Sequence, residues 1–489
     1  MGCSFDADGH HSCKYRNTHA ISDSTAWTSF PFADRINLDR IILMEHLDIA
    51  IVALVVVAFA LVSGRISSTP VTGPMIFVVC GFVLGPDVLD LVNLSLDNEI
   101  VLFLAEVTLA LLLFSDAARI DVKCLASQHS LPIRMLGIGL PLTIVLGAVL
   151  AIPLFPDDGI WELFLIAAIL APTDAALGQV VVSSPRIPVR IRQALNVEGG
   201  LNDGIAAPLV TIFAALVIAE QDFLTAANVT RFIAEQIGFG LIAGVGIGAV
   251  GALLVRRFSK LGWMDGVFRQ LAILALAIGA WALAIAIGGN GFVAAFCGGL
   301  TFGALSSRGG MQPAKLTEFT EDEGQLLALI TFLIFGGTLV GRALIDITWQ
   351  VVVYAVLSLT VIRMLPVALS LTGTHVSAAT KAFLGWFGPR GLASIIFALV
   401  VVEESGMHEA DDLLDAVTLT VLFSVFAHGF SATPLSNWYA GLAEHPDNKL
   451  GLPERAEVHE HPVRYTPMHL RKQRPLQHEA QTGNDPEDV

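Results

Sequence analysis

The sequence has 489 residues, of which 54% are hydrophobic and only 15% are charged, with a mean hydropathy of +0.68 and a formal net charge of −16. Soluble domains carry about 25% charged residues, so this composition argues against an ordinary water-soluble enzyme. Lys and Arg number 28 against 44 Asp and Glu. This acidic balance argues against a nucleic-acid partner, which requires a basic surface.

Apolar runs of about 20 residues can cross a membrane as helices. The sequence contains thirteen candidates, which predict an all-α polytopic membrane protein embedded in a lipid bilayer. The expected spans lie near residues 47–64, 71–89, 98–115, 135–155, 161–183, 194–219, 232–255, 270–287, 290–305, 325–341, 348–372, 382–402 and 416–437.

Basic residues are distributed unevenly among the loops between these spans. One alternating set of loops contains fourteen Lys and Arg, and the other contains only Arg231 and Arg342. Cytoplasmic loops carry the excess of basic residues. The sequence therefore predicts that the first set is cytoplasmic, with the N-terminus outside and the C-terminus in the cytoplasm.

Polar segments flank the expected membrane domain, which covers residues 44–440. Residues 1–43 lack the apolar stretch of a signal peptide. They would have to be translocated in this orientation, so Met44 is an alternative start of the natural protein. Residues 441–489 are polar and Pro-rich, which predicts a disordered cytoplasmic tail.

Charged side chains inside membrane spans are costly and are usually functional. Any one such acid could equally be a helix cap, but four acids in three spans favour a functional site. The six charged residues in the expected spans are Glu106, Asp174, Glu198, Asp203, Arg363 and Arg390.

Two of the expected spans contain residues that interrupt a helix. In the fifth span, Pro172 lacks a backbone donor and is followed by Thr173 and Asp174. In the twelfth, Arg390 follows Pro389, and the apolar sequence on both sides argues against the alternative of a cytoplasmic turn. Irregular backbone at membrane depth is tolerated only where it is buried in protein or lines a cavity. We therefore expect two broken helices, in spans five and twelve.

The sixth expected span carries three polar residues within two helical turns. Glu198 and Asn202 are four residues apart and share a helix face, and Asp203 is turned about 100° further. A carboxylate beside an amide offers oxygen ligands to a hard cation. Arg363 cannot lose its charge, so it needs an anionic or carbonyl partner. We expect it to pair with Glu198 and hold span six against span eleven.

The topology contains an internal symmetry. Spans four to six and spans eleven to thirteen run in opposite senses, and the middle member of each triplet is the one expected to be broken. Inverted repeats with discontinuous helices are a recurrent design of secondary transporters.

Five segments together resemble the NhaP-type sodium/proton antiporters of the monovalent cation:proton antiporter superfamily. They are LAPTDA, VEGGLNDG, GGNGFVAAFCGGLTFG, FLIFGGTLVG and FGPRGLAS, within about residues 45–440. The resemblance implies a thirteen-helix fold, and a core domain from the spans near 135–219 and 348–437. It also implies a homodimer formed through the spans near 47–115 and 232–341, in the cell membrane.

The resemblance also implies site residues and a mechanism. Asp203 would bind either one Na⁺ (with Li⁺ or K⁺ as alternatives) or a proton, and would be exposed alternately to each side. Asn occupies the place of a second Asp found in electrogenic relatives, which implies electroneutral one-for-one exchange. The positions that match the family are Asn202 and Asp203, Thr173 and Asp174, the structural bridge between Glu198 and Arg363, and the span-three acid Glu106. Thr173, Asn202 and Glu106 would help to form the cation site, and Asp174 would offset helix-end charges where spans five and twelve cross.

Two residues depart from the family pattern. Ala175 follows Asp174 where family members commonly have Pro, so we expect the break in span five to depend on Pro172. Gly199 occupies the place of a Ser that helps to bind the cation in many members. The missing hydroxyl leaves the preferred cation open.

Other classes of function have less support in the sequence. A potassium/proton antiporter or a channel-like potassium efflux protein would share the fold, but a tail of roughly 50 residues is too short for a nucleotide-binding domain. The sequence contains no H-E-x-x-H, G-x-S-x-G or G-x-x-x-x-G-K-[ST] motif, so we expect neither an enzyme nor a cofactor. Its five Cys show no C-x-x-C spacing, so no structural metal is expected.

Overall fold

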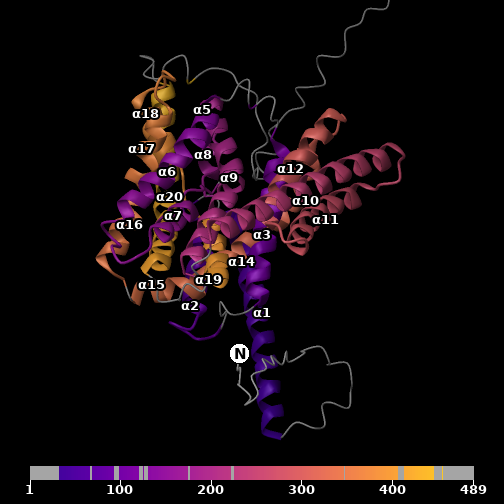
Figure 1. Cartoon of the computed structure of the whole chain (residues 1–489), viewed down its shortest axis with the longest axis vertical. Helices are drawn as coiled ribbons and strands as arrows, with labels where there is room; N and C mark the ends of the chain where they lie inside the picture. Colours follow the sequence, from indigo (N-terminus) through magenta and orange to yellow (C-terminus); the bar gives the residue numbers. More distant parts are fainter. Residues whose placement is uncertain are drawn as a thin grey trace, which may run out of the picture. The chain divides into compact units, whose positions relative to one another are not determined.

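The computed structural model describes residues 32–66, 69–92, 99–120, 125, 130–174, 177–221, 225–345, 347–405, 412–444 and 454. Side chains are described from Leu47 onward. The described chain is helical and contains no β-strand (Figure 1). Residues 1–31, Ala175 and all of the expected tail beyond Glu444 except Glu454 lie outside the described residues.

The chain divides into two compact units, Met1–Val56 and Val57–Val489. The first contributes the beginning of α1 (Phe32–Ile66), so part of the expected polar extension is helical. Its Leu47, Ile49 and Leu54 are exposed, as in a helix that faces an apolar medium.

The second unit contains the remaining helices. They are α2 (Gly73–Leu84), α3 (Glu99–Arg119), α5 (Ser130–Arg134), the π-helix η2 (Met135–Gly139), α6 (Leu140–Ala151), α7 (Ile160–Ile169), α8 (Gln179–Val182), α9 (Val189–Gln221), α10 (Ala226–Lys260), α11 (Gly266–Ala286), α12 (Gly291–Arg308), α13 (Pro313–Leu316), α14 (Glu318–Phe335), the π-helix η3 (Gly336–Val340), α15 (Gly341–Ile345), α16 (Trp349–Leu359), α17 (Val361–Ser370), α18 (Ala378–Trp386), α19 (Leu392–Ser405) and α20 (Asp412–Glu444).

Within the described residues, nine helical segments are long and apolar enough to cross a membrane. Three shorter apolar helical segments, Gly73–Leu84, Ile160–Ile169 and Leu392–Val401, fall within further expected spans. Every one of the thirteen expected spans overlaps at least one helix. The predicted all-helical membrane architecture is present, whereas the exact number of crossings stays a prediction.

Polar caps fix where the membrane helices begin. The Asn290 side chain accepts a hydrogen bond from the Val293 N–H at 2.9 Å, and thereby starts α12. Just before it, Gly288 has a φ of 81°, a conformation that favours glycine and ends α11. These two residues divide the eighth and ninth expected spans at the position expected from the sequence.

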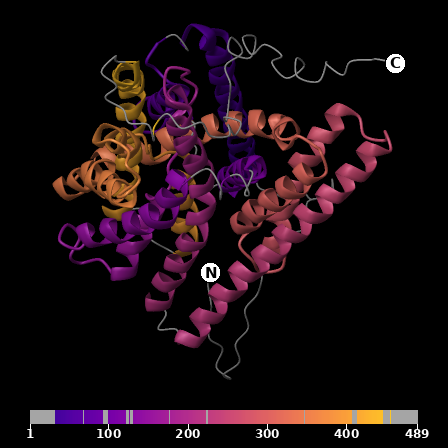
Figure 2. The same ribbon diagram turned by 90° about the horizontal axis from the view of Figure 1, so that it is seen from above.

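Glycines allow α12 to approach its neighbours closely. A side chain on Gly299 would overlap the backbone of Phe114 in α3, and one on Gly248 of α10 would overlap the backbone of Gly298. Helices in membranes gain most from such close backbone packing, because lipid provides no hydrophobic drive for association. Figure 2 shows α10 and α12 side by side.

Helices that are distant in the sequence pack together around the two expected interruptions. Helix α20 packs against α16, α19 packs against both α9 and α7, and α18 contacts α9. This packing brings the fifth, sixth and twelfth expected spans into one buried region.

Candidate functional site

Two non-helical segments face one another in the second unit. Helix α7 ends at Ile169 and α8 begins at Gln179, while α18 ends at Trp386 and α19 begins at Leu392. The Asp174 N–H donates to the Pro389 carbonyl at 2.7 Å, and the Leu392 N–H donates to Asp174 Oδ2 at 3.0 Å. The negative side chain therefore lies at the amino-terminal end of α19, where a helix favours an anion.

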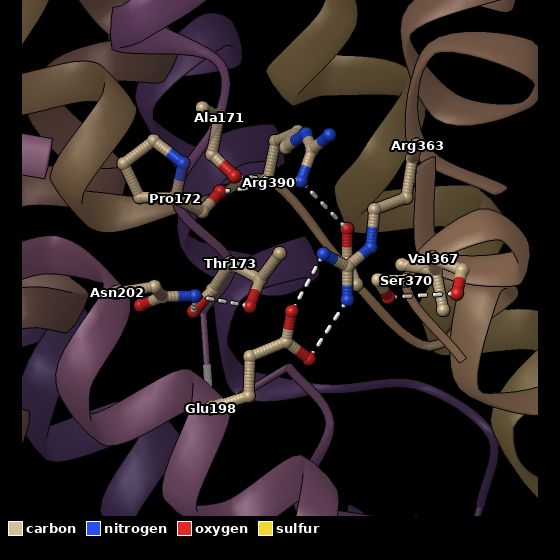
Figure 3. Close-up of polar contacts among 10 residues, drawn as sticks. Ala171, Pro172, Thr173, Glu198, Asn202, Arg363, Val367, Ser370 and Arg390 are labelled. Carbon is tan, nitrogen blue, oxygen red and sulfur yellow. Dashed lines mark hydrogen bonds and ion pairs between the residues drawn. The ribbon is translucent and has the colours of Figure 1, made fainter. Parts of the chain in front are cut away.

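Arg390 donates hydrogen bonds to backbone carbonyl groups at these two interruptions. It is fully buried, and its Nη1 donates to the carbonyl oxygens of Ala171 at 3.2 Å, Pro172 at 3.4 Å and Gly388 at 3.3 Å. Figure 3 shows the guanidinium beside the 171–172 backbone. Carbonyl groups at helix ends are costly to bury unpaired. Arg390 thus satisfies carbonyls from both interrupted spans.

Glu198 and Arg363 form a buried ion pair between α9 and α17. Arg363 Nη1 lies 2.6 Å from Glu198 Oε1, and Nη2 donates to Oε2 at 2.8 Å (Figure 3). Each side chain is 3% exposed. Such a two-bond geometry is strong and directional, so it fixes α9 against α17 as expected from the sequence.

Asn202 and Glu198 lie on the same side of α9 but contact different partners. Its Nδ2 donates to both Oγ1 and the carbonyl oxygen of Thr173, the latter at 3.2 Å. This contact turns the amide oxygen, Oδ1, away from Thr173. The amide therefore keeps an oxygen available as a ligand.

Two buried oxygen atoms beside this contact make no hydrogen bond within the described residues. They are Oδ1 of Asn202 and Oδ1 of Asp203. Asp203 is 8% exposed, and Asp174 lies near enough for the two carboxyl groups to repel each other when both are charged. Buried polar atoms normally have partners. Buried oxygens without a partner, on two consecutive residues of α9, fit a cation or a proton as the missing partner.

Glu106 and Asp174 line separate cavities. Glu106 is half-buried and lines a cavity of about 360 Å³ together with Thr211 and Asn290. Asp174 lines another, of about 310 Å³, with Ser183. The two cavities share no lining residue, and neither is lined by Asp203. The structure thus places Asn202 against Thr173 and Asp203 near Asp174, whereas Glu106 lines a cavity that Asp203 does not line.

The comparison with protein families decides the identity of the chain. Residues 50–438 match the model described as "Sodium/hydrogen exchanger, transmembrane". The chain belongs to the sodium/hydrogen exchanger family. This membership confirms the resemblance on which the sequence predictions rest.

Relatives of this exchanger include proteins named as antiporters. It is 26% identical over 401 residues to the Na⁺/H⁺ antiporter ApNhaP of Aphanothece halophytica, covering 80% of this chain and 73% of that protein. It is also 26% identical over 396 residues to the K⁺/H⁺ antiporter NhaP of Alkalimonas amylolytica, covering 80% of this chain and 66% of that protein.

A solved structure has the same fold. The sodium proton antiporter MjNhaP1 from Methanocaldococcus jannaschii superposes with a TM-score of 0.65 at 19% identity, over 81% of this exchanger and 100% of that chain. The likeness confirms the predicted NhaP-type, all-α membrane fold.

Sequence reasoning missed a histidine at the second interruption. His428 is 1% exposed on α20, and its Nε2 donates to the Trp386 carbonyl at 2.8 Å. Its Nδ1 lies 3.2 Å from the Ser424 hydroxyl, which accepts the Arg390 backbone N–H at 2.6 Å. The His428 and Ser424 side chains therefore bind backbone groups on both sides of the interruption between α18 and α19. A histidine within the apolar run TVLFSVFAHGF was the signal that could have identified it.

A second missed feature is an ion pair at the end of α3. Arg119 is one of the fourteen basic residues counted in the predicted cytoplasmic loops; it lies in the last turn of α3 and pairs with Glu321 of α14. It also donates to Thr317 Oγ1 at 3.0 Å. Both charged side chains are at most 7% exposed. Counting basic residues in loops treats each one as solvated, and therefore missed this contact.

The break in span five involves a contact in addition to the proline expected to cause it. Helix α7 ends at Ile169, three residues before Pro172. The carbonyls of Ala171 and Pro172 bond to Arg390 instead of continuing a helical ladder. A contact distant in sequence thus accompanies the interruption, and the dependence of the break on Pro172 stays a prediction.

Proposed function

We propose that this exchanger is a secondary active transporter that exchanges a monovalent cation for a proton, with Na⁺ as the first candidate and Li⁺ or K⁺ as alternatives. The curated relatives are Na⁺/H⁺ and K⁺/H⁺ antiporters, which supports cation:proton exchange. The observation that carries the assignment to a site is that buried oxygens of Asn202 and Asp203 have no hydrogen-bond partner among the described residues.

Asp203 is the proposed carrier. Burial disfavours the charged form of a carboxyl group, so a proton or a cation must compensate the charge. Only one of the two can occupy the same oxygen atoms at a time, and this competition couples their movements. Asn202 contributes a neutral oxygen, so one cation exchanged for one proton leaves the net charge of the loaded site unchanged.

The neighbouring residues position this carrier. Thr173 orients the Asn202 amide, and Asp174 with Arg390 compensates the ends of the interrupted helices. Glu106 lies on the path of the cation to the site, because it lines the cavity that extends along the next turns of α9. The Glu198–Arg363 pair has a structural role.

The family membership supports a proposed homodimer, and the distribution of basic residues supports a proposed orientation in the membrane. We propose a homodimer in the cell membrane, formed through the spans near 47–115 and 232–341. The core, from the spans near 135–219 and 348–437, moves against it and exposes Asp203 alternately to each side. The excess of basic residues in one set of loops supports an outside N-terminus and a cytoplasmic tail.

Transport by purified protein in proteoliposomes tests this function. Asp203→Asn keeps the shape of the side chain but cannot exchange a proton, so we expect it to abolish cation-driven proton movement while the protein folds normally. Asp265→Asn, at an exposed position before α11, is the matched control and should transport like the wild type. Full activity of Asp203→Asn would refute the carrier assignment.

The second candidate is a potassium/proton antiporter, favoured by the relative from Alkalimonas amylolytica. The same proteoliposomes, given Na⁺, Li⁺ and K⁺ in turn under one pH gradient, distinguish the two. Faster exchange with K⁺ than with Na⁺ would replace the first candidate with the second. Potassium flux without any proton movement would instead indicate a channel-like efflux protein.

A further inference from the structure

A glutamate from the tail is buried at the beginning of α18. Glu454 lies ten residues beyond the end of α20 and is 0% exposed. Its Oε1 accepts a hydrogen bond from the Ser377 backbone N–H at 2.6 Å and another from Thr380 Oγ1 at 3.1 Å. The carboxylate therefore occupies the amino-terminal end of the helix that leads into the second interruption.

The pocket that receives this carboxylate is built by several helices. Ser377 is the N-cap of α18, and its hydroxyl accepts the Thr380 N–H at 3.1 Å. Thr380 Oγ1 also bonds to the Tyr439 hydroxyl of α20 at 2.8 Å, and the Tyr439 ring stacks on Phe383 with centroids 4.2 Å apart. Arg190 of α9 is near enough to act on the charge of Glu454. We call these residues the Glu454 pocket.

The pocket is chemically suited to an anion. The amino-terminal end of a helix presents free N–H groups and a partial positive charge, and Arg190 adds a full positive charge. Burying a carboxylate without such partners is costly. Oε2 of Glu454 makes no hydrogen bond within the described residues, so the contact depends on Oε1 and on electrostatics.

Helix α18 connects this pocket to the candidate cation site. It has nine residues, so its two ends are roughly 14 Å apart. At the far end, the Trp386 carbonyl accepts from His428, and the Trp386 indole donates to Ser431 at 2.9 Å. Gly388, two residues after Trp386, packs against the Arg363 guanidinium. A shift of α18 at its beginning therefore moves groups that surround the two interruptions.

We propose that the tail binds the core through Glu454 and thereby fixes α18, so that the tail sets the apparent affinity for the transported cation. The claim about affinity depends on the proposed transport function, whereas the claim about binding does not. Every partner of Glu454 described above belongs to a core span or to the segment before it, so the tail moves with the core. Loss of the contact frees the beginning of α18 and loosens the backbone near Thr173 and Arg390.

Hydrogen exchange of the full-length protein tests the contact without any transport assay. Loss of a helix cap shifts local opening about fivefold, so Glu454→Ala should raise amide exchange in residues 377–381 by about that factor. Glu454→Gln keeps the shape and loses the charge, so it should give a smaller rise in the same direction. Glu457→Ala, three residues further along the tail, is the matched control and should leave these amides unchanged. Unchanged exchange in Glu454→Ala would overturn the proposal.

A tail peptide separates binding from a general loss of stability. A synthetic peptide of residues 445–489 added to the full-length Glu454→Ala protein should restore protection at 377–381, and the same peptide with Ala at 454 should not. In proteoliposomes, Glu454→Ala should raise the cation concentration for half-maximal exchange severalfold, and the wild-type peptide should reverse this. Failure of the peptide to restore protection, or an unchanged half-maximal concentration, would overturn the proposal. Inactivity of the wild type would instead contradict the proposed function.

Discussion

The side chain of Asp174 occupies the space that Gly391 leaves empty. A methyl group added to Gly391 would overlap the Asp174 carboxyl group. The same carboxylate accepts the N–H of Leu392, the next residue after Gly391. The two interrupted spans therefore approach as closely as they do because one of them has no side chain at this point.

Gly391→Ala should disrupt this approach. The added methyl group must displace Asp174 or the backbone of residues 389–392, and overpacking of this kind costs about 1–3 kcal/mol. We expect lower thermal stability in detergent and strongly reduced exchange. Gly279→Ala in α11, where a methyl group meets no atom within 4 Å, is the matched control. Wild-type behaviour of Gly391→Ala would show that the crossing tolerates rearrangement.

Removing one member of the Glu198–Arg363 pair should lower the stability of the fold more than it changes cation and proton binding at Asp203. Each variant, Glu198→Gln or Arg363→Ala, leaves a buried group without its partner, which costs about 3–5 kcal/mol. Yield of folded protein and the unfolding temperature measure the loss. The Arg231–Glu235 pair is exposed, so Arg231→Ala should change the unfolding temperature little. Equal effects at both pairs would argue against a structural role for the buried pair.

The sequence indicated much of the membrane fold because lipid restricts what a span can contain. Apolar runs identify the helices, and a charge inside a run stands out. Thus Glu198 and Arg363 were paired from their types alone, since neither is tolerated in lipid without a partner. The break in span twelve was anticipated in the same way, from Pro389 beside Arg390.

The remaining features depend on contacts that have no local pattern. Ser424 and His428 lie more than thirty residues after Arg390, and nothing in their spacing shows that they face it. The end of α7 coincides with carbonyl contacts to Arg390, more than two hundred residues away. Glu106 carries a charge in an expected span, but only the three-dimensional arrangement places it in a cavity apart from Asp203.

Thr173 should affect cation affinity through Asn202. Thr173→Val removes the hydroxyl that accepts a hydrogen bond from Asn202 Nδ2. Only the hydrogen bond from Nδ2 to the backbone carbonyl of residue 173 then remains. Loss of one such hydrogen bond costs about 1 kcal/mol, or about a fivefold higher cation concentration for half-maximal exchange. Thr173→Ser retains the hydroxyl and should remain close to the wild type. A similar change in both variants would contradict this role of the hydroxyl, because Thr173→Ser retains it.

Exchange should be independent of membrane voltage. The proposed site contains one carboxylate that alternates between a cation and a proton, and its other oxygen ligand, from Asn202, is neutral. Both loaded forms therefore carry the same net charge across the membrane, and a potential does no work on the cycle. Proteoliposomes with the potential clamped by a potassium gradient and valinomycin, and with Na⁺ as substrate, measure this directly.

Asn202→Asp adds a second carboxylate to the site, so any voltage dependence should appear in this variant and not in the wild type. Wild-type rates that change with voltage would mean that a second charged group joins Asp203 in the transport cycle, and would exclude one-for-one exchange.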